Sequence, residues 1–179
     1  MIECAHLARP GKKIKLARLK PDDEGSFESK EDAIEAAKKN LKALDDLQEI
    51  LYAESKQSLL IVLQAMDGGG KDGTIEFVFS GINPQGCEVH SFKAPTSNEL
   101  AHDYLWRVHQ VCPPRGKFGI FNRSHYEDVL VPVVQKWITP SHAQKRYEHI
   151  NEFERMLNDE GTTIVKFFLH ISKEEQKER

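Results

Sequence analysis

The chain has 179 residues, which suits one domain, and 39% hydrophobic and 30% charged residues are the composition of an ordinary soluble protein. Its formal net charge of −3 disfavours a general nucleic-acid binder, whose footprint is basic. No apolar run approaches the length of a membrane span, and the first residues lack the apolar core of a signal peptide. Cys4, Cys87 and Cys112 are scattered without CxxC spacing, which disfavours a disulfide framework or zinc site and predicts a cytoplasmic protein.

Residues 1–28 predict an irregular N-terminal arm in front of a folded core at 29–179. The arm carries a cluster of basic residues: Lys12, Lys13, Lys15, Arg18 and Lys20. We interpret this cluster as solvated surface. The alternative is that it borders a groove for a polyanion.

Residues 29–55 predict one long amphipathic helix. Ser29 is the expected N-cap, with Asp32 near the positive end of the helix dipole. Apolar residues recur at helical spacing, and we expect this stripe to pack in the core. The stripe consists of Ile34, Ala37, Leu41, Leu44, Leu47, Ile50 and Leu51.

The rest of the chain alternates between short apolar runs and helical patterns. The predicted strands are 59–63, 89–92, 118–121 and 163–171, and the predicted helices are 73–79, 98–108 and 141–159, the last capped by Ser141. Strands that alternate with helices predict an α/β fold, with a parallel sheet covered by helices on both faces.

The stretch 59–74, LLIVLQAMDGGGKDGT, carries the strongest chemical signal. A buried strand breaks into glycines, places one lysine and opens a helix. Glycines let backbone N–H groups converge on an anion, the helix adds the positive end of its dipole, and Lys71 supplies a charge. This arrangement predicts a phosphate cradle and hence nucleotide or polyphosphate chemistry.

The cradle departs from the standard P-loop, G-x-x-x-x-G-K-[ST]. Ala65 takes the place of the first glycine, and Asp72 replaces the residue whose hydroxyl normally reaches Mg²⁺. Thr74 comes two residues too late to be an obvious substitute. The carboxylate of Asp67 would repel phosphate unless a metal or a substrate proton lies there. The alternative interpretation is a plain glycine-rich turn with an exposed lysine.

Two further segments follow predicted strands, at 91–96 and 121–128, and the carboxyl ends of parallel strands meet at one edge of a sheet. Asn122 stands where P-loop enzymes keep an acidic holder of Mg²⁺, and it can orient water on a metal. Glu127 could supply the missing carboxylate. We interpret Asp128 as an exposed acid at a helix start. Arg123 could clamp phosphate, or else pair with Glu127.

The segment 102–107, HDYLWR, places Arg107 four residues after Asp103, so the two can pair on one helical face. Functionally, Arg107 and Lys93 could hold a phosphate tail, whereas Trp106 is expected to be core. The histidines form no ligand pair and are interpreted as structural. Ser91 and Ser124 lack the context of a nucleophile elbow, which disfavours acyl-transfer hydrolysis.

Taken together, the chain resembles the polyphosphate kinase 2 family, P-loop phosphotransferases that move phosphoryl groups between inorganic polyphosphate and nucleotides. The similarity runs from about residue 30 to the end. It is carried by LYAE (51–54), MDGGGKDGT (66–74), VFSGINPQGCEVHSFKAPT (78–96), HDYLWR (102–107), GIFNRSHYEDVLV (119–131), INEFERML (150–157) and LHISKEEQ (169–176). Asn122 followed by SHYEDVLV resembles the subgroup that acts on both nucleoside mono- and diphosphates.

The resemblance implies a three-layer αβα sandwich of the P-loop kinase type and a role for each matching residue. Catalytic positions would be Asp67, Lys71, Asn122, Arg123 and Glu127, with Asp67 and Asn122 at a Mg²⁺ ion that Mn²⁺ could replace. Phosphate and nucleotide would contact Gly68, Gly69, Gly70, Asp72, Gly73 and Thr74, and polyphosphate would contact Lys93 and Arg107. The implied partners are polyphosphate and adenine or guanine nucleotides, with no nucleic acid or membrane, in a homo-oligomer.

Two departures from the family pattern stand out. Family members often carry Arg-Val-His after the DVLV stretch, where this chain reads Pro132-Val133-Val134-Gln135, so a basic contact is expected to be missing. Relatives also continue past the position of Arg179 into a helical lid with a catalytic arginine, so we expect the lid to be absent or truncated here.

The predicted function is Mg²⁺-assisted, in-line phosphoryl transfer from polyphosphate to ADP or AMP. Two alternatives stay open. One is a P-loop nucleoside or nucleotide kinase with ATP as donor, and the other is a module that binds polyphosphate or nucleotide without catalysis.

Overall fold

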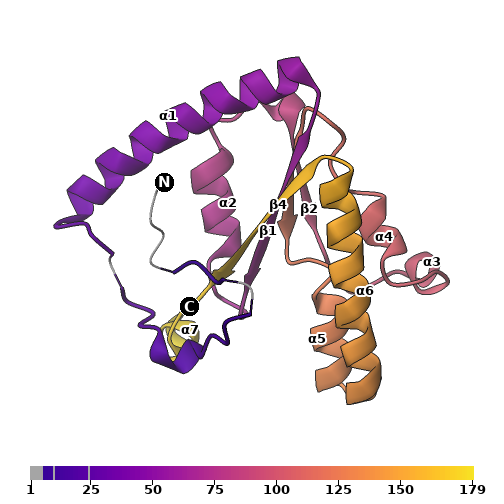
Figure 1. Cartoon of the computed structure of the whole chain (residues 1–179). Helices are drawn as coiled ribbons and strands as arrows, with labels where there is room; N and C mark the ends of the chain where they lie inside the picture. Colours follow the sequence, from indigo (N-terminus) through magenta and orange to yellow (C-terminus); the bar gives the residue numbers. More distant parts are fainter. Residues whose placement is uncertain (1–5, 10, 24) are drawn as a thin grey trace.

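The computed structural model describes residues 6–9, 11–23 and 25–179, so Cys4 and the start of the predicted arm lie outside the described residues. A four-stranded, fully parallel sheet forms the centre (Figure 1). Its strands are β1 (Ser58–Ala65), β2 (Cys87–Ser91), β3 (Phe118–Asn122) and β4 (Thr162–Leu169), in the spatial order β2-β3-β1-β4. Cys87 and Cys112 are free thiols.

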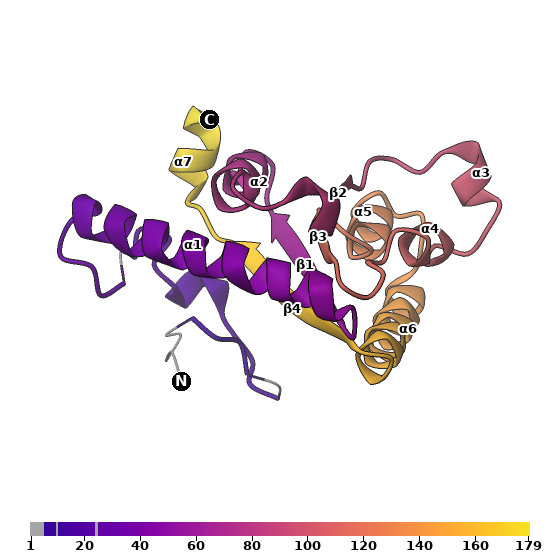
Figure 2. The same ribbon diagram turned by 90° about the horizontal axis from the view of Figure 1, so that it is seen from above.

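Helices cover both faces of the sheet (Figure 2), which confirms the predicted three-layer αβα architecture. The helices are α1 (Lys30–Glu54), α2 (Lys71–Phe79), α3 (Ser97–Leu100), α4 (Trp106–His109), α5 (Glu127–Val134), α6 (Pro140–Asp159) and α7 (Lys173–Glu178), with 3-10 turns η1 (Leu16–Arg18) and η2 (Pro84–Gly86). In the described part of the chain, no helix combines the length and the apolar character that crossing a bilayer requires.

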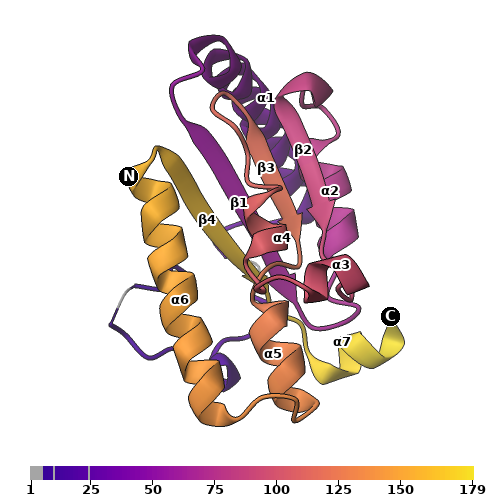
Figure 3. The same ribbon diagram turned by 90° about the vertical axis from the view of Figure 1, so that its right-hand side faces the viewer.

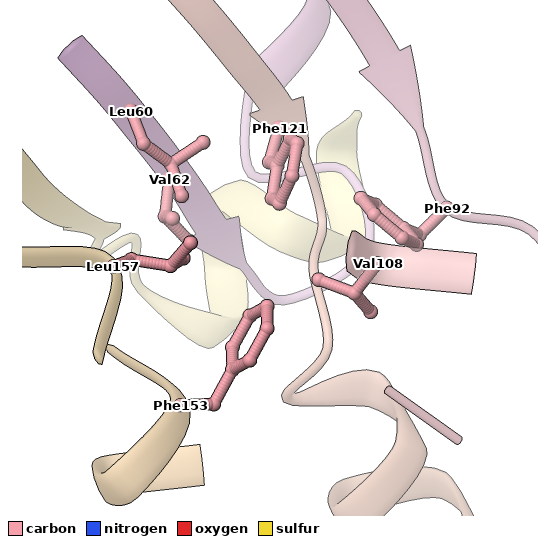
Figure 4. Close-up of a cluster of buried hydrophobic side chains, with 7 residues drawn as sticks. All are labelled: Leu60, Val62, Phe92, Val108, Phe121, Phe153 and Leu157. Carbon is pink, nitrogen blue, oxygen red and sulfur yellow. The ribbon is translucent and has the colours of Figure 1, made fainter. Parts of the chain in front are cut away.

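Alternation along β1 and β3 divides the core into two layers, because successive strand side chains point to opposite faces. One layer joins the strands to α4 and α6 (Figure 4), through Leu60, Val62, Phe92, Val108, Phe121, Phe153 and Leu157. The other joins them to α1 and α2, through Ile61, Leu63, Phe118 and Ile120 packed against Leu44, Leu51, Ile75 and Phe79.

The chain leaves the neighbouring strands β1 and β3 toward opposite faces of the sheet. After β1 it enters α2, which packs on one face, and after β3 it enters α5 and α6, which lie on the other (Figure 3). Ligands of open α/β sheets bind at such a switch point, outside the carboxyl ends of the strands. The topology thus places the binding crevice between the turns that follow β1 and β3.

Helix α1 is capped by Ser29 as predicted, its hydroxyl accepting from the backbone N–H of Asp32 at 3.1 Å. The prediction that its whole apolar stripe packs in the core is wrong. Ile34, Leu47 and Ile50 are 40%, 61% and 56% exposed. The face turned to the sheet instead runs through Leu41, Leu44, Gln48 and Leu51, and Leu47 and Ile50 lie to the side of that line at 100° per residue.

The predicted helix over 98–108 is in fact two single turns, α3 and α4, separated by a bend. The cause is Asp103, whose Oδ1 accepts from the backbone N–H groups of Leu105 (3.0 Å) and Trp106 (3.1 Å) and thereby starts α4 afresh. Trp106 is only partly buried and stacks on the His102 ring, with 4.0 Å between ring centroids, so it is not a core residue.

Helix α6 begins one residue earlier than predicted, and Ser141 is not its cap. Thr139 is the N-cap, accepting from the backbone N–H of His142 at 3.2 Å, and Pro140 occupies the first turn, where its missing N–H costs nothing. The basic residues of the arm, Lys12, Lys13, Lys15, Arg18 and Lys20, are all exposed, in agreement with solvated surface.

Candidate active site

A cleft of about 1060 Å³ opens at the carboxyl ends of β1, β2 and β3. All but one of the predicted site residues line it: Asp67, Gly68, Gly69, Gly70, Lys71, Asp72, Gly73, Lys93, Arg107, Asn122, Arg123 and Glu127. The exception is Thr74. Its hydroxyl donates to the carbonyl of Gly70 at 2.9 Å, inside α2, so it does not stand in for the hydroxyl that the P-loop lacks.

Lys71 is not the exposed lysine of a plain turn. It is the first residue of α2, it is 8% exposed, and its Nζ lies 3.5 Å from the carbonyl oxygen of Ala65. Among the residues that the structure describes, this buried ammonium group has one neutral acceptor and no acidic side chain within ion-pair distance. The cradle is therefore built around a positive charge that an anion in the cleft would neutralise.

Two glycines are required by the shape of the loop. A Cβ on Gly69 would lie 2.4 Å from the Cβ of Ala65 and 2.8 Å from the carbonyl oxygen of Met66. Gly70 has φ +85 and occupies the N-cap of α2 in the left-handed region. The chain thus turns sharply from strand to helix, and the first turn of α2, whose backbone N–H groups have no acceptor within the helix, lines the cleft.

The turn after β3 meets the P-loop through Arg123. Its Nη2 lies 2.6 Å from Oδ1 of Asp67, whereas its Nη1 lies 3.9 Å from Oε2 of Glu127. The pairing with Glu127 that we left open is thus the weaker contact. Because the side chain of Asp67 is 81% exposed, water screens its pair with Arg123, and a ligand could compete for either partner.

The oxygen atoms around the P-loop fit Mg²⁺. Among the described residues, no group of three or more His, Cys, Asp or Glu side chains could hold a metal. Mg²⁺ does not need one, because it keeps several waters and is typically bound by one or two carboxylates together with substrate phosphates. Asp67 lines the cleft, and the Asn122 amide nitrogen donates to Asp72, while its oxygen accepts no hydrogen bond from the described residues. This donor set matches the preference of a hard cation.

Arg107 forms a buried ion pair with Asp128 and not the predicted pair with Asp103. Its Nη2 lies 3.1 and 2.9 Å from the two carboxylate oxygens of Asp128, and its Nη1 donates to the backbone carbonyl of Lys93 at 2.9 Å. Asp128 is 9% exposed, so the prediction of an exposed helix-start acid is also wrong. Burial raises the pKa of Asp128, and the guanidinium of Arg107 opposes that rise without cancelling it.

This pair ties the segment after β2 to α5 and leaves the exposed side chain of Lys93 at the cleft. Arg146 of α6 adds to the same wall. Its guanidinium carbon lies 4.5 Å from the centroid of the Tyr104 ring, and its Nη1 donates to the backbone carbonyl of Asp128. The sequence analysis gave no role to Tyr104, although it lies in the HDYLWR segment, and it missed Arg146, because no local motif marks that residue.

Helix α7 lies against the P-loop, a contact that the sequence did not indicate. Nε2 of Gln176 donates to the carbonyl of Asp67 at 2.9 Å, and Nη1 of Arg179 donates to the carbonyl of Gly68 at 3.2 Å. The partners are 109 and 111 positions apart. Arg179 thus adds a further cation to the lining of the cleft.

Comparison with known proteins agrees with this geometry. The family model described as polyphosphate kinase 2 (PPK2) matches residues 27–179. The chain is 58% identical over 172 residues to an AMP/ADP-polyphosphate phosphotransferase of Meiothermus ruber, covering 96% of this chain and 64% of that protein. It is 45% identical to an ADP-polyphosphate phosphotransferase of Rhodopseudomonas palustris, covering 94% of this chain and 63% of that protein.

A solved structure resembles the fold closely. The crystal structure of polyphosphate kinase 2 from Arthrobacter aurescens TC1 superposes with a TM-score of 0.91 at 42% identity, covering 96% of this chain and 62% of that one. The chain therefore spans somewhat less than two thirds of the length of these three relatives. On the family match, the fold and the cleft together, the chain belongs to the polyphosphate kinase 2 family.

Proposed function

We propose that the protein is a nucleotide kinase that transfers phosphoryl groups between inorganic polyphosphate and nucleoside mono- or diphosphates, such as AMP and ADP. The observation that carries this proposal is the convergence of Lys71, Asp67 and Arg123 on one phosphate cradle. The names of relatives up to 58% identical support polyphosphate as donor.

In this proposal the protein works by positioning and charge neutralisation, because phosphoryl transfer needs little covalent help. Gly68, Gly69, Gly70 and Gly73, with Asp72 in the same loop and helix, form the nucleotide and phosphate cradle, from which Thr74 drops out because its hydroxyl donates to Gly70. Lys71 neutralises the transferring group and Arg123 clamps it. The exposed ammonium of Lys93 guides the polyphosphate chain.

Arg107 would support the polyphosphate site indirectly. Its guanidinium donates a hydrogen bond to the backbone carbonyl of Lys93 and so holds that segment in place. Asp67 and Asn122 would hold Mg²⁺, or Mn²⁺ in its place, with Glu127 nearby. The bound ion would supply a positive charge that stabilises the phosphates. A cytoplasmic location, assembly into a homo-oligomer, the range of adenine and guanine nucleotides and the division into an arm at 1–28 and a core at 29–179 stay predictions.

The test is to incubate the protein with Mg²⁺, ADP or AMP and long-chain polyphosphate and to follow ATP or ADP formation. We expect polyphosphate-dependent product. Product that requires ATP as donor and ignores polyphosphate would favour another P-loop kinase, and tight binding without turnover would favour a binding module.

Lys71→Ala should lower turnover by about a hundredfold or more, as loss of a single preorganised charge at a transition state typically does. Lys56→Ala is the matched control. Lys56 is exposed in the connection between α1 and β1, outside the residues that line the cleft, and its removal should leave turnover unchanged. Equal turnover in the two variants would contradict the proposed role of Lys71.

A further inference from the structure

A polar cluster, buried at His125 and open to solvent at Lys166, joins three elements beneath the turn that follows β3. The carboxylate of Glu154, on α6, is its centre. Oε1 accepts from Nε2 of His125 at 3.2 Å and from the hydroxyl of Tyr126 at 2.9 Å, and Oε2 accepts from Nζ of Lys166, on β4, at 2.6 Å. Nζ of Lys166 also donates to the Tyr126 hydroxyl at 3.0 Å, which closes the cluster.

The cluster is a specific arrangement and not a solvated group of charges. His125 is fully buried, and the side chain of Glu154 is 13% exposed. In the part of the chain that the structure describes, Nδ1 of His125 has no hydrogen-bond partner. The bond to Glu154 is therefore the polar contact that orients this ring. A carboxylate that accepts three charge-assisted or hydroxyl donors is held in one place.

The cluster lies next to a strained residue of the proposed active site. Arg123 has φ +64, a left-handed conformation that is strained for a non-glycine residue. Such a conformation persists only where the surroundings determine it strongly. On the upstream side, the backbone N–H of Arg123 donates to the carbonyl of Leu63 at 3.0 Å. On the downstream side, the second and third residues after Arg123 are His125 and Tyr126, the two that Glu154 holds.

We propose that Glu154 is a positioning residue: through His125 and Tyr126 it fixes the turn that points Arg123 at the phosphate cradle. Glu154 itself is not among the residues that line the cleft. Its effect would therefore reach the reacting phosphate through the turn that carries Arg123, whose Nη2 lies 2.6 Å from Asp67. This inference rests on the proposed phosphoryl transfer, because the role of Arg123 is defined by that reaction.

Steady-state kinetics of Glu154→Ala, with polyphosphate and ADP as substrates, test the inference. We expect kcat to fall about 10- to 100-fold, the typical cost of a small misplacement of a catalytic group, while KM for ADP changes less than about threefold. Glu152→Ala is the matched control. Glu152 lies on the same helix and pairs with Arg155 at 2.6 Å on the surface, so its removal should leave both constants unchanged.

A double-mutant cycle separates positioning from general stability. If Glu154 acts through Arg123, adding Glu154→Ala to Arg123→Ala should lower kcat by less than about twofold, far from the product of the single effects. Tyr126→Phe, which removes only one hydroxyl donor, is a milder perturbation of the same cluster. It should lower kcat about 2- to 5-fold, an effect that also disappears in the Arg123→Ala background, and it serves if Glu154→Ala does not fold.

Multiplicative losses of kcat in an active protein would overturn the positioning role and leave the proposed function standing. An unchanged kcat in Glu154→Ala or in Tyr126→Phe would do the same. A wild-type protein without any polyphosphate-dependent turnover would overturn the proposed function, and the inference with it.

Discussion

The two walls of the cleft are built in opposite ways. One wall is the P-loop, in which eight consecutive positions, 67–74, supply glycines, a lysine and the start of a helix. The other wall comes from α4, α5, α6 and the segment after β2, held together by Arg107, Asp128 and Arg146. The first wall depends on local backbone shape, and the second depends on buried pairs between residues distant in sequence.

The difference between the two walls shows which charged side chains are available to a ligand. In the P-loop, the described residues offer Lys71 one partner, a backbone carbonyl, so its charge is available to an anion in the cleft. In the opposite wall, the charge of Arg107 is neutralised by Asp128, and its Nη1 donates to the backbone carbonyl of Lys93. An arginine that lines a phosphate-binding cleft can thus be structural, and the exposed ammonium of Lys93 is the better candidate for contact with polyphosphate.

The largest expected effect is a loss of stability, in the wall that depends on pairs between residues distant in sequence. Arg107→Ala leaves the buried carboxylate of Asp128 without its counter-ion and should cost about 3–5 kcal/mol of unfolding free energy. Lys93→Ala should cost little stability, because its side chain is exposed, but should raise KM for polyphosphate. Urea denaturation of both variants measures the contrast. A loss below about 1 kcal/mol in Arg107→Ala would mean that the pair is solvated.

The next effect is a loss of turnover, in the wall formed by the P-loop. In Gly69→Ala the new methyl group would meet the Cβ of Ala65 and a backbone carbonyl, so the loop must move. We expect about a hundredfold loss of turnover, near 3 kcal/mol of transition-state stabilisation. Gly119→Ala is the control, because its clash is with the ring of Pro113 in a part of β3 outside the cleft lining. It should lower the melting temperature and leave the active fraction at wild-type turnover. Equal turnover in the two variants would contradict the role of the loop.

Acid stability gives a third contrast, between Glu154 and Asp128. Burial alone would raise the pKa of Glu154, but hydrogen bonds from His125, Lys166 and Tyr126 outweigh it and lower the pKa from 4.5 to about 2. A carboxylate whose pKa is lower in the folded state stabilises the fold above the unfolded pKa, and this contribution is lost as pH falls. The loss should fall between about pH 4.5 and 2 and amount to about 3 kcal/mol.

Unfolding by urea from pH 6 to pH 2, in the wild type and in Glu154→Gln, measures this contribution. The difference in stability between the two proteins should shrink as the pH falls through that window, since Gln does not titrate. Asp128 has the opposite sign. Its pKa is raised, so its charged form destabilises the fold at neutral pH, and this destabilisation disappears on acidification. A constant difference between wild type and Glu154→Gln would contradict the lowered pKa.

Much of the fold was predictable from the sequence, because it depends on local patterns. All four strands and the phosphate loop follow from apolar runs that end in turn residues, and the alternation with helices predicts the layers. The P-loop residues and Arg123 fall together because parallel strands end at a common edge. These parts of the site can be predicted without knowing how the helices pack.

The rest could not be predicted, because it depends on pairing between distant residues. Asp103 and Arg107 have a spacing typical of a helical ion pair, but the Asp103 carboxylate accepts from the backbone N–H groups of Leu105 and Trp106 and so breaks the helix. Arg107 then turns to Asp128, a residue whose burial no local pattern shows. The contact of α7 with the P-loop and the cluster around Glu154 are equally non-local.

The smallest expected effect sharpens the comparison within the P-loop itself, at Gly73. Unlike Gly69, it has no heavy atom within 4 Å of where a Cβ would lie, and it is in the first turn of α2. The fold therefore does not need glycine there, and Gly73→Ala should stabilise the protein by about 0.5–1 kcal/mol through helix propensity. Gly73 also lines the cleft, so its missing side chain leaves room for a ligand to approach the backbone. We expect a higher melting temperature together with a higher KM for nucleotide.

Gly81→Ala is the matched control, since Gly81 is equally open but lies outside the residues that line the cleft. Its KM should not change. If Gly73→Ala binds nucleotide as well as the wild type does, then phosphate does not approach that part of the helix, and the cradle consists of residues 68–70 with Lys71. If KM for nucleotide rises in Gly73→Ala, glycine at position 73 is explained by close approach of the ligand. Glycine at position 69 is instead required by the shape of the loop itself.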